Sequence, residues 1–131
     1  MNPGTAYRVV AAQGASPVGL VVQLYEQMIQ DLVRAVQALE QNNTERRTRE
    51  INHALTVLGW LQGTLDMRRG GTVAGNLLRF YTSVRAGLLE AQSSASRQVL
   101  EEQISWLLEV RQAWVEVERE RAGNSPPTFT Q

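Results

Sequence analysis

The sequence predicts an all-α protein, an antiparallel up-and-down four-helix bundle that follows an N-terminal arm. Four segments carry apolar residues at the i, i+3, i+4 and i+7 spacing of an amphipathic helix. The connections between these segments are short and polar, which favours antiparallel packing of consecutive helices. No segment shows the alternating pattern of a strand. A chain of 131 residues is long enough for one domain with its own core.

The first expected helix follows an arm at residues 1–15, which are small, contain glycine and lack a periodic apolar pattern. Ser16 is a favoured N-cap residue, and Pro17 fits the first helical position because its missing N–H needs no partner there. We expect this helix over residues 16–41, ended by the polar residues 42–44. Its core line comprises Val21, Leu24, Tyr25, Met28, Leu32, Val36 and Leu39.

The second and third helices are expected over residues 45–67 and 72–92, on either side of a break at Gly70 and Gly71. Two adjacent glycines adopt positive φ at low cost and destabilise a helix by about 1 kcal/mol each. Thr72 is the expected N-cap of the third helix. The core line of the second helix is Ile51, Ala54, Leu55, Leu58, Leu61 and Leu65. That of the third is Val73, Leu77, Tyr81, Val84 and Leu88.

The fourth helix, expected over residues 96–121, carries two apolar lines where a simple surface helix needs one. The first line is Leu100, Ile104, Leu107, Leu108 and Val115. The second line is Val99, Trp106, Val110 and Val117. At about 100° per residue the two lines lie roughly a third of a turn apart, so this helix has two apolar surroundings. The bundle as a whole is expected over residues 16–122, and residues 123–131 as a disordered tail.

The composition argues against several classes of function. Thirteen basic residues, all of them arginine, balance thirteen acidic ones, so a clustered positive face for nucleic acid is not expected. The chain has no cysteine, which removes disulfides and thiol chemistry and fits a reducing compartment. Neither a signal peptide nor a run of 18 apolar residues is present, so we expect a cytoplasmic protein without a membrane span.

One motif, Glu50-x-x-His53, is typical of a catalytic metal centre in helical bundles, since it is half of the ligand set of a di-iron protein. A di-iron oxidase needs a second such pair and two further glutamates, whereas this chain has one histidine in total. His53 is expected on the solvent side of its helix, away from the serine and threonine residues that it would have to activate. We therefore expect no enzymatic activity, no metal site and no cofactor.

The second helix also has an apolar line opposite its core line, consisting of His53, Val57, Trp60, Thr64 and Met67. A bundle helix touches two neighbours, which widens its apolar stripe, but this does not account for Trp60. We expect an exposed interaction patch in which Trp60 and Trp106 are the strongest contacts. The expected contact residues are Tyr7, Val10, Val57, Trp60, Met67, Leu78, Trp106, Val110 and Val117.

Three occupants fit such a patch. An amphipathic helix of a partner, laid into a groove of the bundle, is the mode most natural to this fold. A homodimer interface is the alternative, which would make the protein a self-associating structural or adaptor bundle. The protein's own arm, through Tyr7 and Val10, is the third. We accordingly expect either a monomer or a weak homodimer.

Short motifs occur in a fixed order over residues 6–114. They are Ala6-Tyr7, Ala15-Ser16-Pro17-x-x-Leu20, Leu24-Tyr25-Glu26, Leu65-Asp66-x-x-x-Gly70-Gly71-x-x-Ala74-x-Asn76-Leu77, Tyr81, Leu88-x-Glu90-Ala91 and Ala113-Trp114. In the order and spacing of these motifs the sequence resembles the FliS-type flagellar secretion chaperones. It departs from them at Glu26, where the family tends to have Asp, and at Gln27-Met28, where it tends to have Gly-Ala.

The resemblance implies a cytoplasmic four-helix bundle without catalytic activity. It implies that the bundle binds the disordered C-terminal segment of flagellin, which becomes helical on the apolar surface, and so prevents premature polymerisation before type III secretion. It also implies that the N-terminal arm shields the binding groove, with Tyr7 in that role. Other flagellar export or regulatory proteins are further expected partners.

Overall fold

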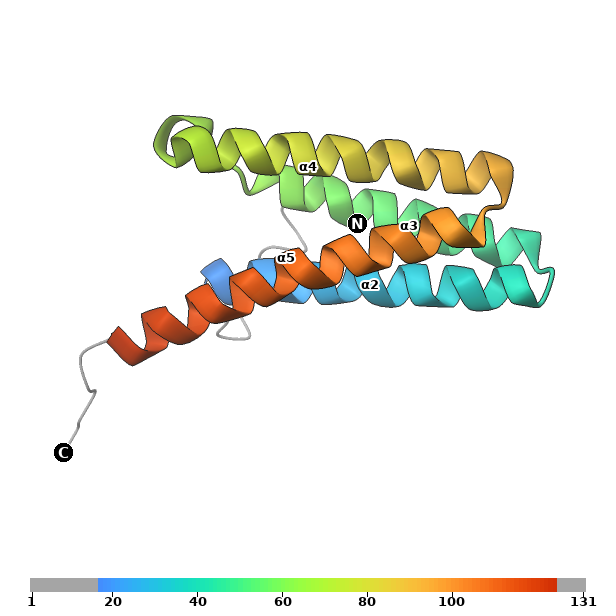
Figure 1. Ribbon diagram of the computed structural model, residues 1–131, viewed down its shortest axis with the longest axis horizontal. Helices are drawn as coiled ribbons and strands as arrows, with labels where there is room; N and C mark the ends of the chain where they lie inside the picture. The colour runs from blue at the N-terminus through green and yellow to red at the C-terminus, as the bar shows by residue number, and fades with distance from the viewer. Residues whose placement is uncertain (1–16, 125–131) are drawn as a thin grey trace.

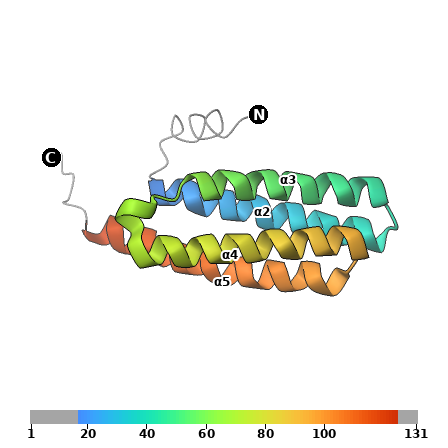
Figure 2. The ribbon, with the colours of Figure 1, turned by 90° about the horizontal axis from the view of Figure 1, so that it is seen from above.

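The computed structural model describes residues 17–124, which form four antiparallel helices (Figure 1). They are α2 (Pro17–Glu40), α3 (Thr44–Gly63), α4 (Met67–Ser94) and α5 (Arg97–Asn124). The helices share one long axis (Figure 2), and each packs against two others. Because α2 and α4 both pack against α3 and α5, the diagonal pairs of the bundle are α2 with α4 and α3 with α5. The predicted all-α up-and-down four-helix bundle is confirmed.

The first two helices begin close to the predicted residues. Pro17 is the first residue of α2, as expected, whereas the predicted cap Ser16 lies outside the described residues. Asn43 caps α3, because its side-chain oxygen accepts a hydrogen bond of 3.0 Å from the backbone N–H of Arg46. This satisfies one of the four N–H groups that a helix N-terminus leaves without an internal partner.

The second connection lies at residues 64–66, before the glycine pair, so the predicted bounds of 45–67 and 72–92 are wrong here. The Thr64 hydroxyl donates to the carbonyl of Leu61 at 2.6 Å in the last turn of α3. Asp66 then caps α4 by accepting from two backbone N–H groups at 3.1 Å each. A carboxylate cap also interacts favourably with the helix dipole, which makes Asp66 a stronger start signal than Thr72. Gly71 keeps its positive φ of 52°, but as a kink inside α4.

The centre of the core is a pair of tyrosines on diagonal helices. The Tyr25 hydroxyl of α2 donates to the Tyr81 hydroxyl of α4 at 2.8 Å, and both side chains are fully buried. Burial, followed by the neighbouring Tyr81 hydroxyl, raises the pKa of Tyr25, and burial likewise raises the pKa of Tyr81. Both hydroxyls therefore stay neutral in the folded protein at physiological pH, and their hydrogen bond satisfies two polar groups inside an apolar core.

Two residues that the periodicity places on core lines are exposed instead. Val73 is 65 % exposed because it follows the kink at Gly71, at the end of α4 that lies farthest from α5 (Figure 1). Leu108 is 46 % exposed because its side of α5 faces the outer groove between α2 and α5. The other residues of the predicted core lines are buried or half-buried.

The packing of α5 against α4 is uneven along the bundle. The two helices lie close together beside the connection that joins them, and they separate toward the C-terminal end of α5 (Figure 1). Helix α5 continues to Asn124, past its predicted end at residue 121. Residues 1–16 and 125–131, which include the predicted arm and most of the predicted tail, lie outside the described part of the chain. Over residues 17–124, no helix is long and apolar enough to cross a membrane.

Candidate partner-binding site

Several large apolar side chains are exposed, and they lie on α2, α4 and α5. Among the described residues they are Val33, Met67, Val73, Leu78, Leu89, Trp106, Leu108 and Val117. Four of the predicted contact residues are in this set, namely Met67, Leu78, Trp106 and Val117. Single exposed apolar residues are ordinary on protein surfaces, so a site requires that several of them gather.

The predicted patch on α3 is not exposed, and this part of the prediction is wrong. Val57 is fully buried, and Trp60 is half-buried against the core. The side of α3 that carries them faces α2, because His53 on the same line contacts Asp31 of α2. Trp60 packs edge-on against His53, with ring centroids 6.5 Å apart. Val57 and Trp60 of the second apolar line are therefore covered within the same chain, whereas His53 and Met67 at the two ends of the line are exposed.

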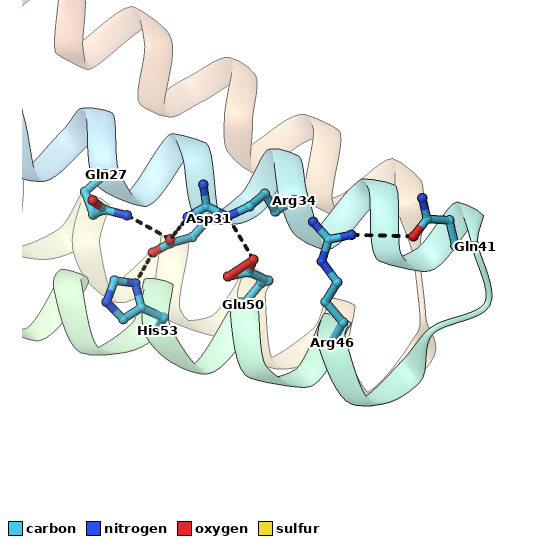
Figure 3. A network of polar contacts seen from close by, with 7 residues as sticks. All are labelled: Gln27, Asp31, Arg34, Gln41, Arg46, Glu50 and His53. Atoms are coloured by element: carbon cyan, nitrogen blue, oxygen red, sulfur yellow. Dashed lines mark hydrogen bonds and ion pairs between the residues drawn. The ribbon is translucent and has the colours of Figure 1, made fainter.

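A network of hydrogen bonds and ion pairs joins α2 and α3 at this interface (Figure 3). The carboxylate of Asp31 is fully buried and accepts from Gln27 at 3.0 Å and from Arg34 at 2.8 Å. His53 Nδ1 lies 2.6 Å from the other Asp31 oxygen, and Arg34 also binds Glu50 at 2.8 Å. Three partners thus satisfy a charge whose burial would otherwise be costly.

The same network accounts for both residues of the Glu50-x-x-His53 motif. Glu50 binds Arg34 and His53 binds Asp31, so both side chains have partners across the α2–α3 interface. Within residues 17–124 no three acidic or histidine side chains lie close enough together to hold a metal ion. The motif therefore acts as a structural contact between two helices.

The α4–α5 interface contains a ladder of residues seven apart on each helix, which we name the open seam. On α4 these residues are Gly87, Phe80 and Val73, and on α5 they are Gln103, Val110 and Val117. At the first step the helices touch, because any side chain on Gly87 would collide with Gln103. Because the helices are antiparallel, Phe80 and Val110 are the second step of the seam, and Val73 and Val117 are its last step.

Exposure rises from step to step along the open seam. Gly87 and Gln103 are buried, and Phe80 and Val110 are half-buried. Val73 and Val117, at the last step, are 65 % and 40 % exposed. Trp106 lies on the rim of the seam, one helical turn from Gln103 and from Val110, and is 42 % exposed. The second apolar line predicted on the fourth helix therefore faces α4, and α4 covers only part of it.

The wide end of the open seam leads into a pocket of about 560 Å³ at the end of the bundle. Val73 and Leu77 of α4 and Trp114 of α5 line it, together with residues of α2 and of the α3–α4 connection. Pro17, the first described residue, also lies on its wall, so the chain enters the bundle at this pocket. Tyr7 and Val10, the predicted arm contacts, lie outside the described residues.

A second apolar depression, which the sequence did not predict, lies between α2 and α5. We name it the α2–α5 groove, and its volume is about 450 Å³. It is lined by Val33, Val36, Gln37, Glu40, Glu101, Ile104, Ser105 and Leu108. A signal was present in the sequence, because Val33 and Leu108 each lie at the outer edge of an apolar stripe. Taken alone, Val33 is explained by the wide apolar stripe of a bundle helix, and Leu108 is explained by its place on a predicted core line.

Comparison with known proteins identifies the family. The family described as flagellar protein FliS matches residues 1–121, nearly the whole chain. The chain belongs to the FliS family. It is 35 % identical over 100 residues to the flagellar secretion chaperone FliSB of Pseudomonas aeruginosa, covering 76 % of this chain and 79 % of that protein. It is 30 % identical over 108 residues to the flagellar secretion chaperone FliS of Salmonella typhimurium, covering 82 % and 80 %.

A third relative from this FliS family is the flagellar secretion chaperone FliS of Vibrio cholerae. The identity is 27 % over 116 residues, which cover 86 % of this chain and 85 % of that protein. All three relatives are named as secretion chaperones. The resemblance drawn from the short motifs is therefore confirmed at the level of the family.

Proposed function

We propose that this FliS-family chain is a cytoplasmic export chaperone that binds the disordered C-terminal segment of flagellin and prevents its polymerisation before type III flagellar secretion. The open seam is the observation that carries the proposal. It is an apolar surface that widens between two helices, in a chain whose relatives are named flagellar secretion chaperones. Other flagellar export or regulatory proteins are further partners under this proposal.

The open seam has the properties that such a ligand needs. A disordered segment cannot bury its own apolar side chains, so it tends to associate with other copies of itself. Docking as an amphipathic helix removes that surface from water, at about 25 cal/mol for each Å² buried. Ordering the segment opposes binding, so the contact must be rich in large apolar side chains. Trp106, Val110 and Val117 are the proposed contacts on α5. Met67 and Leu78 lie eleven residues apart on another face of α4, which they share with Leu89, so they are not proposed as contacts of the open seam.

Calorimetric titration of the full chain with a synthetic peptide of the flagellin C-terminal segment tests this function. We expect a one-to-one complex, and we expect Trp106→Ala to raise the Kd by about tenfold or more, because buried aromatic side chains dominate such interfaces. Helix content should change little, since Trp106 is already partly exposed. Leu89→Ala is the matched control, because Leu89 is an exposed apolar residue of α4 on the side away from the open seam.

Two outcomes would count against the proposal at different levels. Absence of peptide binding by the unaltered chain would contradict the chaperone function itself. Equal affinity of the unaltered chain and of Trp106→Ala would contradict only the assignment to the open seam. Sedimentation at micromolar concentration separates the alternative function, since a dimer that does not respond to the peptide would indicate a self-associating bundle instead.

A further inference from the structure

The face of the bundle formed by α4 and α5 carries opposite charges on its two helices. Helix α4 contains four arginines and one glutamate, whereas α5 contains six glutamates and four arginines. On α5, Glu102, Glu109 and Glu116 are seven residues apart, so they form one exposed acidic line. Within residues 17–124 none of these three glutamates forms an ion pair.

Arg79 is an exposed arginine of α4 beside the middle of the open seam, one residue before Phe80. Its guanidinium group donates a hydrogen bond to the side-chain oxygen of Asn76. Around the circumference of α4, Asn76 lies between Arg79 and Val73. The hydrogen bond therefore directs Arg79 toward the open seam. Among the described residues no carboxylate lies within ion-pair distance of Arg79.

The contact between Gly87 and Gln103 sets the relative heights of Arg79 and Glu109 on this face. Arg79 precedes Gly87 by eight residues, which is about 12 Å along α4. Glu109 follows Gln103 by six residues, which is about 9 Å along α5. Because the helices are antiparallel, both displacements run toward the wide end of the open seam. Arg79 and Glu109 therefore lie at heights that differ by about 3 Å.

Apolar surface lies between these charged groups. Val73, Trp106 and Val117 of the open seam and its rim are 65 %, 42 % and 40 % exposed. Exposed apolar side chains that gather on one face of a protein mark a contact surface. The face thus has an apolar centre, an arginine on one side and glutamates on the other, and an apolar centre with a polar rim is typical of a protein interface.

A second copy of the same face satisfies both the apolar and the charged groups. A two-fold axis parallel to the helices lays α4 of each copy over α5 of the other at the same height. Each Arg79 then lies opposite the Glu109 of the other copy, so this contact forms twice, and the two open seams cover each other. A two-fold axis perpendicular to the helices would instead place α5 on α5 and bring their glutamates together. Charge therefore favours the first arrangement.

We propose that two copies of this chain bind through their α4–α5 faces about a two-fold axis parallel to the helices, so that each copy covers the open seam of the other until flagellin binds. The contact extends over the wide half of the seam, because at the narrow end Glu90 of α4 would lie opposite Glu102. Such a contact is small, so we expect a Kd of about 10 to 100 μM. The dimer does not depend on the proposed function, whereas its displacement by flagellin does.

Sedimentation velocity of the full chain without peptide, from about 1 to 200 μM, tests the dimer. We expect a monomer–dimer equilibrium. Arg79→Glu and Glu109→Arg each bring like charges together twice per dimer and should each raise the Kd by about tenfold or more. Arg49→Glu and Glu45→Arg are matched controls, since they make the same changes of charge at exposed positions on α3. They should leave the Kd within about twofold of that of the unaltered chain.

A mixture of the two interface variants tests the symmetry of the contact. In a dimer of one Arg79→Glu chain with one Glu109→Arg chain, both copies of the contact again pair opposite charges. We expect this mixture to recover the Kd of the unaltered chain to within about threefold, while each variant alone remains largely monomeric. Circular dichroism should show unchanged helix content, since both residues are exposed.

A synthetic peptide of the flagellin C-terminal segment tests whether the dimer covers the open seam. Because the seam cannot hold the peptide and a second copy at once, the peptide should convert the dimer into one-to-one complexes. The same sedimentation experiment measures this conversion, with the dimer and the peptide complex distinguished by mass.

Each outcome separates the dimer from the proposed function. A monomer at all concentrations would overturn the dimer, and so would a dimer that both charge reversals leave intact or that the mixture fails to restore. A dimer that persists with peptide bound would overturn the covering of the open seam. Failure of the peptide to bind either the dimer or the monomeric variants would contradict the proposed function alone, and recovery of the dimer in the mixture would still support the contact between copies.

Discussion

The α2–α3 and α4–α5 interfaces bury their second apolar lines to different extents. On α3 the middle of the second line is covered, since Val57 is fully buried and Trp60 is half-buried beside the Asp31 network. On α5 the second line is covered only in part, since Val110 is half-buried and Val117 at the far end is exposed. The two lines look alike in the sequence, so the angle between neighbouring helices decides which of them becomes a surface.

The largest expected effect comes from placing a charge on each of the two lines. Val57→Asp buries an unpaired carboxylate and should lower the free energy of unfolding by about 4 kcal/mol or more, which is enough to unfold many small domains. Val117→Asp should change it by less than about 0.5 kcal/mol, because that side chain is exposed. Urea unfolding followed by circular dichroism measures both, and similar losses would contradict the comparison.

A substitution at the narrow end of the open seam should have an effect of intermediate size on stability. Gly87→Ala should destabilise the fold by about 1 to 3 kcal/mol, since the added methyl group would displace the buried amide group of Gln103. Gly75→Ala is the matched control in the same helix, where an added methyl group meets only the flexible end of Arg79, 3.9 Å away. It should stabilise by about 0.5 to 1 kcal/mol, because alanine favours helix more than glycine does.

Thermal unfolding of the two glycine variants gives the sign of each change in stability directly. Opposite shifts of Tm would support a close contact at Gly87 that is absent at Gly75. A stabilised Gly87→Ala protein would contradict this prediction, because the Gln103 side chain would then make room for the methyl group without loss of packing.

A substitution in the polar network of the α2–α3 interface should have the smallest effect on stability. Asp31→Asn removes a buried charge that three side chains contact, and should lower the free energy of unfolding by about 1 to 2 kcal/mol. The loss is limited because Arg34 and His53 are partly exposed and regain water. Exposed Glu109→Gln is the control, and chemical denaturation at constant pH is the measurement. Equal stability of the two variants would mean that apolar packing alone stabilises the α2–α3 interface.

The fold was predictable from sequence because its determinants are local. Apolar periodicity and short polar connections are sufficient for four antiparallel helices, and the ordered motifs are sufficient for the family. The second connection was misplaced because Asp66 caps α4 before the glycine pair, and Gly71 makes a kink where a break was predicted. Where an N-cap residue and a glycine pair both lie near a helix end, packing decides at which of them the helix begins. Apolar periodicity carries no information about that packing.

The candidate site was only partly predictable for a related reason. Trp106 and Val117 were correctly placed on an exposed flank, whereas Val57 and Trp60 were not. Helical spacing gives the direction in which each side chain leaves its own helix. Whether another helix covers that side chain depends on how the helices pack. The α2–α5 groove was missed for the same reason, since Val33 and Leu108 belong to different helices and meet only in the folded bundle.

The contact between Gly87 and Gln103 lies about 21 Å along α5 from Val117. Over that length an inclination of about 10° between α4 and α5 separates them by about 4 Å, which is the width of an aliphatic side chain. The taper of the open seam therefore needs only a small departure from parallel axes, and the packing of α2 against α5 holds that inclination in place.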